Sequence, residues 1–315
     1  MRNFQRILFL AIFGTYLVIL AGAVVRGTGS GLGCPDWPRC FGQWVPPTDI
    51  SELPANYKEI YKIAGKTIAD FDPFKTWTEY VNRLLGVLLG IIMIILFGYS
   101  FLMKRYEKNL PWFTGGLLIL IIIQGGIGAL VVSTHLKPFI ITIHMFLAIL
   151  LLFGLIYLRK YCQDLENTAI VLTTDRKAIT LTGVLVGLTF FQVLLGTQVR
   201  QAVDHLMRDT QEATALTVID KLGGIFYFHR TFSLIILGLF IYLLIYLVKN
   251  NTNRGMIFLA LMAFFSVLGN VVTGISLNYF DFPANAQPPH LFFGVLTLGL
   301  LYTLSLNLRG TLLDE

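Results

Sequence analysis

Three histidines stand where apolar segments of membrane-spanning length begin, and their side chains can bind metal. They are His144, His229 and His290, out of five histidines in the 315-residue sequence. An ionisable residue inside a membrane span is energetically expensive and is therefore a candidate for function. Neutral imidazole is a common ligand of metal ions and of haem iron. Because a helix rises about 1.5 Å per residue, we expect all three at a similar depth, near one face of a membrane.

The two histidines of the C-terminal half form the strongest pair. His229 and His290 are expected on two helices of one bundle, and side chains on facing helices can build a haem site in its core. Two axial ligands to one b-type haem are the hypothesis that this arrangement favours. A single histidine can equally cap a helix end or donate to a carbonyl. Two histidines at one depth, one of them repeated in the other half, favour the iron ligands.

The N-terminal half offers a different set of groups. Asn82 stands where the C-terminal half has His229, and an amide is not a normal ligand of haem iron. His144 is then the one axial ligand expected there. Two ligands suit electron transfer, whereas an open iron face suits oxygen chemistry or exchange of a substrate. The alternative is one haem in the whole protein, with His144 in a structural role.

A carboxylate and four arginines accompany these positions. Glu79 precedes Arg83 by four residues and shares a helix face with it. Glu79 can relay protons during an oxidation, or it can pair with Arg83 and favour the helix N-terminus. The arginines on this side are Arg26, Arg83, Arg200 and Arg230. Their guanidinium groups can hold haem propionates through paired hydrogen bonds, or they can extend to the membrane surface.

The elements that position these residues are membrane-spanning helices. Hydrophobic residues make up 55% of the chain and charged residues 13%, against roughly 25% charged in a soluble domain. Eight apolar segments are long enough for a bilayer, which takes about 20 residues of helix. They are Ile7–Val25, Leu84–Met103, Trp112–Val132, Phe139–Leu158, Ile179–Val199, Thr231–Val248, Met256–Ser276 and Leu291–Leu308. The even-numbered spans are expected to begin one or two turns earlier, and so to contain the polar positions.

The lysines and arginines predict the orientation. Both termini and the short even-numbered loops carry twelve basic and six acidic residues, and the other side carries twelve of each. The net charge of +6 therefore lies on one side, which by the positive-inside rule is the cytoplasm. The long loop 26–82 is expected to face outward. This distribution indicates a bilayer as the partner of the basic residues, and nucleic-acid binding is not indicated.

An internal repeat predicts the domain organisation. The matched positions are Gly22–Arg26 with Gly196–Arg200, Asn82-Arg83 with His229-Arg230, Gln124 and Gly128 with Asn270 and Gly274, and His144 with His290. Four spans in each half give both halves the same orientation, related by an axis along the membrane normal. We expect two four-helix bundles, 1–160 and 178–315, joined by the cytoplasmic linker 161–177.

Two cysteines stand close together in the outer loop. Cys34 and Cys40 are separated by five residues, and the oxidising side of a membrane favours a disulfide between them. A metal site needs more ligands than this loop shows. Closing so short a loop stabilises by about 2–3 kcal/mol in the chain-entropy model. A redox role therefore stands beside the structural one.

The run Gly27–Cys40, after Val25-Arg26, closely resembles the first outer loop of the haem A synthase family. Further matches, covering essentially the whole chain, are Glu79–Arg83, Gln124–Gly128, His144, His229-Arg230 and His290. The resemblance implies an enzyme that oxidises one methyl group of haem O to a formyl group by successive hydroxylations. The product is haem A for cytochrome oxidase. Implied partners are haem O synthase and cytochrome oxidase assembly factors, in a bacterial plasma membrane.

The resemblance also assigns roles to the candidate residues. His229 and His290 would hold a haem b cofactor, with Arg200 and Arg230 expected beside it. The N-terminal half would receive haem O, with His144 as iron ligand and Glu79 as the catalytic carboxylate. Asn82, Arg83 and Arg26 are the remaining residues expected at the substrate. The cysteine pair matches the family members that have an outer-loop disulfide.

One position departs from the family pattern. The second span of family members usually reads Glu-x-x-His-Arg, and here Asn82 replaces the histidine. We expect the substrate haem to be held by His144 alone. The alternatives are that His135, in the adjacent outer loop, is the missing ligand, or that the protein only binds haem.

Other functions predict other patterns. A plain electron-transfer cytochrome b would favour two symmetric bis-histidine sites, and Asn82 counts against it. A transporter or haem-transfer protein commonly has its site at the midplane, whereas these residues cluster near one face. A haem O-forming prenyltransferase would need paired acidic motifs for Mg²⁺-diphosphate, and no Asp-x-x-x-Asp occurs in the sequence.

Overall fold

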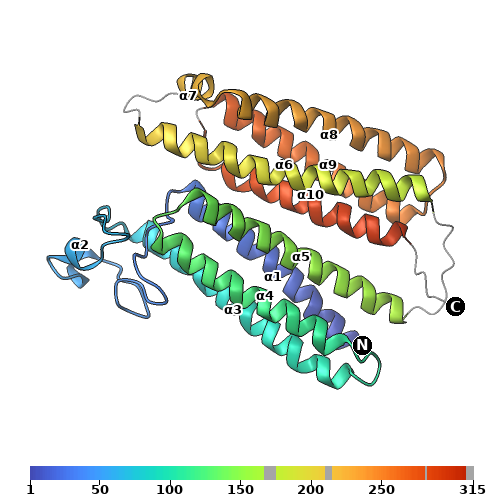
Figure 1. Cartoon of the computed structure of the whole chain (residues 1–315), viewed down its shortest axis with the longest axis horizontal. Helices are drawn as coiled ribbons and strands as arrows, with labels where there is room; N and C mark the ends of the chain where they lie inside the picture. The colour runs from blue at the N-terminus through green and yellow to red at the C-terminus, as the bar shows by residue number, and fades with distance from the viewer. Residues whose placement is uncertain (167–174, 210–214, 281, 310–315) are drawn as a thin grey trace. The chain divides into compact units, whose positions relative to one another are not determined.

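The fold is built from long helices. A computed structural model describes residues 1–166, 175–209, 215–280 and 282–309, and within these ranges it contains helices and no β-strand. Eight helices are long and apolar enough to cross a membrane. They are α1 (Arg2–Gly27), α3 (Pro73–Met103), α4 (Leu110–Ser133), α5 (Pro138–Glu166), α6 (Arg176–Asp209), α8 (Gly224–Lys249), α9 (Arg254–Tyr279) and α10 (Gln287–Leu308) (Figure 1). The predicted all-α membrane protein with eight spans is confirmed.

The starts of the helices follow from local sequence. The side chain of Asp72 accepts a hydrogen bond from the Lys75 amide and so caps α3, whose first turn contains Pro73. Proline is also found in the first turns of α4 and α10. Proline suits this position because its φ is preset and its missing N–H is not needed there. As predicted, α3, α8 and α10 begin a turn or more before their apolar runs, whereas the prediction is wrong for α5, which begins only one residue before its run. The three candidate histidines and Asn82 all lie within helices.

The chain divides into two compact units, Arg6–Leu151 and Met1–Gln5 with Leu152–Glu315. In the second unit α6, α8, α9 and α10 form a closed ring, in which each helix contacts two others. Buried apolar side chains such as Phe240 and Leu301 fill its interior. Helix α5 runs on to Glu166 and α6 begins at Arg176, so both ends of the expected linker are helical. The division into bundles 1–160 and 178–315 stays a prediction.

The first unit connects its helices in the same chain order. Helix α1 packs on α3 where Gly14 meets Leu89, and α3 contacts α4. Helix α4 meets α5 where the Gln124 side chain donates to the backbone oxygen of His144. This neighbour order is consistent with the predicted pseudo-symmetry of the two halves. Large apolar side chains on the outer faces, among them Ile119 and Ile91, are exposed, as expected for surfaces that lipid covers.

The long loop after α1 is folded. It contains a short 3-10 helix, η1 (Ile50–Glu52), and α2 (Tyr57–Ile60). Phe41 lies at the centre of an aromatic cluster, with its ring centroid 6.3 Å from that of Tyr57, 5.4 Å from Tyr61 and 5.6 Å from Phe71. Both cysteines are buried in the same cluster. The sequence had predicted the loop's place in the chain and the disulfide, but not this small aromatic core.

A second short helix precedes α8. Helix α7 (Ala215–Leu222) places Val218, Ile219 and Leu222 against Val203 of α6 and Phe226 of α8. Together with the extension of α6 to Asp209, this apolar cluster covers the end of the bundle that contains His229. It was not expected, because α6 was predicted to end with its apolar run.

Candidate functional site

The structure brings the predicted histidine pair together. His229 of α8 and His290 of α10 are half-buried, with ring centroids 6.4 Å apart and ring planes at 73°. Metal–imidazole nitrogen bonds are about 2 Å long, so two rings on opposite sides of one iron have centroids roughly 6 Å apart. The separation therefore suits one iron atom between two imidazoles.

A glycine on a neighbouring helix lies against each ring. A Cβ added at Gly196 of α6 would lie 3.2 Å from Cε1 of His229, and one added at Gly274 of α9 would lie 3.1 Å from Cε1 of His290. Carbon atoms in favourable contact are about 3.5–4.0 Å apart. A residue larger than glycine at either position would collide with the imidazole. The backbones of α6 and α9 therefore limit the position of Cε1 in both rings.

The first unit repeats this arrangement. A Cβ at Gly128 of α4 would lie 3.3 Å from Cε1 of His144, and one at Gly22 of α1 would lie 3.9 Å from Oδ1 of Asn82. The three candidate histidines and Asn82 therefore each face a glycine of another helix in the same unit. Gly22 and Gly196 are related by the internal repeat, as are Gly128 and Gly274. The repeated glycines thus leave room for the side chain that each faces.

A side-chain amide holds each histidine from the helix that carries the glycine. The hydrogen bonds run from Gln124 to the backbone oxygen of His144 (2.9 Å), from Gln192 to that of His229 (2.8 Å) and from Asn270 to that of His290 (2.5 Å). Each amide precedes its glycine by four residues. The pairing of α1 with α3 lacks both the histidine and the amide. Asn82 stands where the histidine would be, and Val18 stands four residues before Gly22, where the amide would be.

The donor set fits a haem better than a bare metal ion. Within the described ranges no three His, Cys, Asp or Glu side chains are grouped as a metal site, whereas a porphyrin supplies four ligands itself and needs only axial imidazoles. Nδ1 of His229 and of His144 and Oδ1 of Asn82 are buried without a hydrogen-bond partner among the described residues. Buried polar atoms are normally satisfied, so these three atoms are available to a bound ligand.

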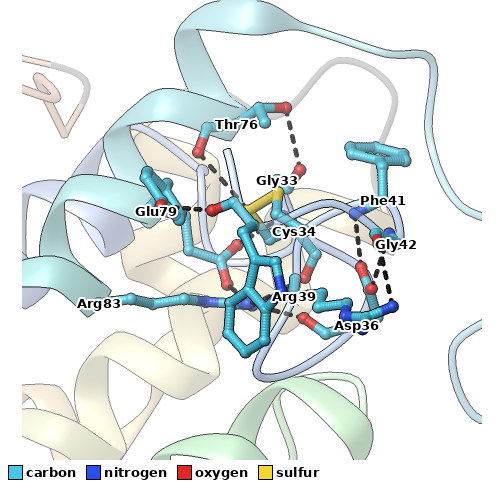
Figure 2. Close-up of a disulfide and its surroundings, with 12 residues drawn as sticks. Gly33, Cys34, Asp36, Arg39, Phe41, Gly42, Thr76, Glu79 and Arg83 are labelled. Atoms are coloured by element: carbon cyan, nitrogen blue, oxygen red, sulfur yellow. Dashed lines mark hydrogen bonds and ion pairs between the residues drawn. A yellow bond between two sulfur atoms is a disulfide. The ribbon is translucent and has the colours of Figure 1, made fainter. Parts of the chain in front are cut away.

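Glu79 and Arg83 face the disulfide loop (Figure 2). The Glu79 side chain is 4% exposed; its Oε1 accepts from Arg83 at 2.6 Å and its Oε2 from the Cys34 amide at 3.0 Å. The Arg83 guanidinium also donates to the backbone oxygens of Cys34 (3.0 Å), Asp36 (2.7 Å) and Arg39 (2.9 Å). Arg83 therefore joins α3 to three carbonyls of the loop. The pairing of Glu79 with Arg83 that the sequence left open is present.

The loop itself is closed and anchored. Cys34 and Cys40 form the predicted disulfide, with Cα atoms 4.8 Å apart. The Asp36 carboxylate accepts from the amides of Phe41 and Gly42 (2.6 and 2.9 Å), which closes the turn (Figure 2). The Thr76 hydroxyl of α3 donates to the Gly33 oxygen at 2.9 Å. These contacts hold the loop against the first turns of α3.

The remaining candidate residues are placed as follows. Arg200 pairs with Asp204 one turn further along α6, at 2.8 Å. The Arg230 guanidinium lies 5.2 Å from the ring centroid of Tyr227, a cation–π arrangement. Arg26 lies in the last turn of α1. Their expected roles beside haem stay predictions. His135 lies between α4 and α5 with a positive φ of 59°, and its role as a ligand also stays a prediction.

Gln192 and Thr273 also contribute to the site, and neither was predicted from the sequence. Gln192 stands four residues before Gly196, the same spacing that Gln124 and Asn270 keep to their glycines, so this spacing could have identified it. Thr273 lies 3.2 Å from Nδ1 of His290. Its repeat-related position is Ile127, so the repeat gave no signal for it.

Comparison with known proteins agrees with this geometry. Over 147 residues the chain is 33% identical to a protein of Shewanella oneidensis named Heme A synthase, covering 46% of this chain and 42% of that protein. Over 205 residues it is 29% identical to a Heme A synthase of Nitrosospira multiformis, covering 60% and 56%. The chain thus spans about half the length of these curated relatives. The COX15-CtaA family, described as cytochrome oxidase assembly protein, matches residues 5–302, and the chain is a member of that family.

Proposed function

We propose that this protein is a haem A synthase, an oxidoreductase that converts one methyl group of haem O to a formyl group. The observation that carries the proposal is the pair His229 and His290, with ring centroids 6.4 Å apart and a glycine against each ring. Membership in the COX15-CtaA family and the relatives named Heme A synthase support it. Net, R–CH3 and one water give R–CHO, four protons and four electrons, and an external electron acceptor takes up the electrons: two hydroxylations give a diol carbon, which loses water to leave the aldehyde.

In this proposal the two halves have different tasks. His229 and His290 would hold haem b, which supplies one-electron transfer when bound. His144 would bind the iron of haem O. Asn82 would offer an amide in place of a second imidazole, and binding through His144 alone would suit a porphyrin that must enter and leave. Helices with exposed apolar faces are a natural path for a substrate with a long prenyl tail.

Glu79 is the proposed catalytic carboxylate. It lies on α3 three residues before Asn82, so the two are about one turn apart on neighbouring parts of one helix face. Arg83 and the Cys34 amide hold both of its oxygens, which orients the carboxylate. It would accept protons that the oxidation of the methyl group releases, and Arg83 would contribute to the substrate site through this orientation.

We further propose a bacterial plasma membrane location with both termini in the cytoplasm. The support is the net charge of +6, all of which falls on the side of the termini. The outer loop, Glu79 and the histidines would then lie near the outer face. The disulfide of the loop fits an oxidising compartment.

A haem-binding protein without catalysis is the second candidate. The observation that favours it is the loss of two features at one position, since Asn82 replaces the histidine and Val18 the amide. Such a protein would be a b-type cytochrome or would pass haem to a partner, and it would keep the C-terminal pair only.

One experiment separates these functions. The chain is expressed in a bacterial host that makes haem O but not haem A, and extracted haems are separated by chromatography. Appearance of haem A or its hydroxylated intermediate supports the synthase, and bound haem b alone supports the second candidate. Protein that binds no haem refutes both.

A variant of Glu79 tests the assigned role. Glu79→Gln should abolish haem A formation and keep the haem b spectrum. Thr76→Val is the matched control, because it removes another contact between α3 and the loop, to Gly33, and keeps the carboxylate. Full activity of Glu79→Gln, or equal loss in both variants, would refute a specific role of the carboxylate.

A further inference from the structure

His290 differs from the other two candidate ligands in the partners of its ring. Its Nδ1 lies 3.0 Å from the backbone oxygen of Asn270 and 3.2 Å from Oγ1 of Thr273. A backbone carbonyl only accepts hydrogen bonds, so Nδ1 is the protonated nitrogen. The other ring nitrogen, Nε2, is then unprotonated and available to a metal.

Thr273 is itself oriented to accept this hydrogen bond. Its hydroxyl proton is directed to its own helix, with the backbone oxygen of Gly269 at 2.8 Å and that of Asn270 at 3.0 Å. A hydroxyl carries one donor and two lone pairs, so the lone pairs are left for Nδ1–H of His290. The contact therefore forms a short chain of hydrogen bonds from the ring to the α9 backbone.

The same residues hold the backbone of His290. The Asn270 side chain donates to the His290 oxygen at 2.5 Å, while the Asn270 oxygen faces the ring of His290. Gly274 lies against the same edge of the ring, since an added Cβ would be 3.1 Å from Cε1 and 3.5 Å from Nδ1. The imidazole is thus fixed in position, in rotation and in tautomer before any ligand binds.

The repeat-related histidine has only part of this arrangement. His144 has the amide of Gln124 and the glycine Gly128. However, its Nδ1 is buried without a hydrogen-bond partner among the described residues, and Ile127 stands where the second half has Thr273. Among the described residues, no partner of Nδ1 therefore fixes the tautomer of His144.

We propose that Thr273, together with the backbone oxygen of Asn270, is a positioning residue that makes His290 the stronger iron ligand. The inference rests on the proposed haem b site. When the ring nitrogen that does not bind the metal donates a hydrogen bond, the ligating imidazole becomes more basic. A more basic ligand favours ferric iron and lowers the reduction potential of the haem. A firmly held haem in one half and an exchangeable one in the other follow from this difference.

The test uses the full chain purified with haem b. Thr273→Val and Thr273→Ala both remove the hydroxyl, one with similar shape and one with less volume, and Thr273→Ser retains it. Thr303→Val is the control on α10, because the Thr303 hydroxyl donates only within its own helix, to Gly299 at 2.7 Å. The readouts are the midpoint potential by redox titration and the rate of haem transfer to apomyoglobin.

The expected result is an upward shift of the potential in the valine and alanine variants. Haem transfer should become about 10-fold faster in both, at the low end of the effect of losing a partner of a metal ligand. The serine variant and Thr303→Val should match the parent. An unchanged potential in either hydroxyl-free variant overturns the inference, as does an equal shift in the serine variant.

Failure of the proposed function gives a different result. If the parent protein binds no haem b, or forms no haem A in the host that makes haem O, the function itself is wrong. The potential and the transfer rate do not depend on haem A formation, so they judge Thr273 separately.

Discussion

Replacing Gly196 by alanine should weaken haem b binding while leaving helix α6 intact. The added Cβ would lie 3.2 Å from Cε1 of His229. Favourable carbon contacts are about 3.5–4.0 Å long, so the ring must retreat by roughly 0.3–0.8 Å from the position given by the 3.2 Å contact. Metal–ligand distances are kept within about 0.2 Å, and the required displacement exceeds that tolerance.

The intrinsic effect on the helix has the opposite sign. Alanine in a helix interior is favoured over glycine by about 0.5–1 kcal/mol. This gain offsets the cost of displacing the His229 ring, so the haem-free variant should keep its fold. We expect a loss of haem affinity of about tenfold or more, which corresponds to about 1.4 kcal/mol.

The assay compares Gly196→Ala with Gly187→Ala. Both glycines lie in α6, but a Cβ at Gly187 meets nothing within 4 Å. Each variant is purified, its haem content per chain is measured from the absorption spectrum, and its haem transfer to apomyoglobin is timed. Equal haem content and equal transfer rates in the two variants would refute the role of the glycine, and so would a Gly196→Ala protein that has lost its fold.

Three further perturbations test the loop and the first unit. Arg83→Gln leaves the buried Glu79 carboxylate unpaired and should lower the free energy of unfolding by about 3–5 kcal/mol. Denaturant unfolding in detergent measures this free energy. The double variant with Glu79→Gln should recover part of the loss. Cys34→Ser should cost about 2 kcal/mol by loop-closure entropy and make the loop more sensitive to protease, with Cys40→Ser giving the same result; a loop as resistant as the parent's contradicts this. Asn82→His should add an axial ligand and raise the haem content per chain, and an unchanged spectrum would argue against a haem position between α3 and α5.

Much of the architecture followed from the sequence because its causes are local. The eight spans depend on continuous apolar runs, and their early starts depend on residues such as Asp72 and Pro73, which act within one turn. The equivalence of His144 and His290 depends only on a repeated pattern. None of these features requires knowing how one helix is rotated against another.

The contacts of the outer loop could be predicted from the sequence only in part. Its cysteines predicted the disulfide, because two nearby thiols on the oxidising side of a membrane favour that bond. The three loop carbonyls that Arg83 binds belong to residues 44 to 49 positions away. Such contacts depend on the path of the chain between them, and the loop could have presented other groups to the same guanidinium.

The sequence by itself placed the three imidazoles on even-numbered spans and predicted a similar depth for them, because each stands near the start of a helix of known rise. Only the tertiary structure decided which atoms surround each ring. A Cβ at Gly196 or Gly274 would crowd a Cε1 atom, and Thr273 lies 3.2 Å from a ring nitrogen, because the helices are rotated and spaced so that these small or polar residues face the rings. Side-chain identity sets what a residue can do, whereas helix rotation and spacing set what it meets.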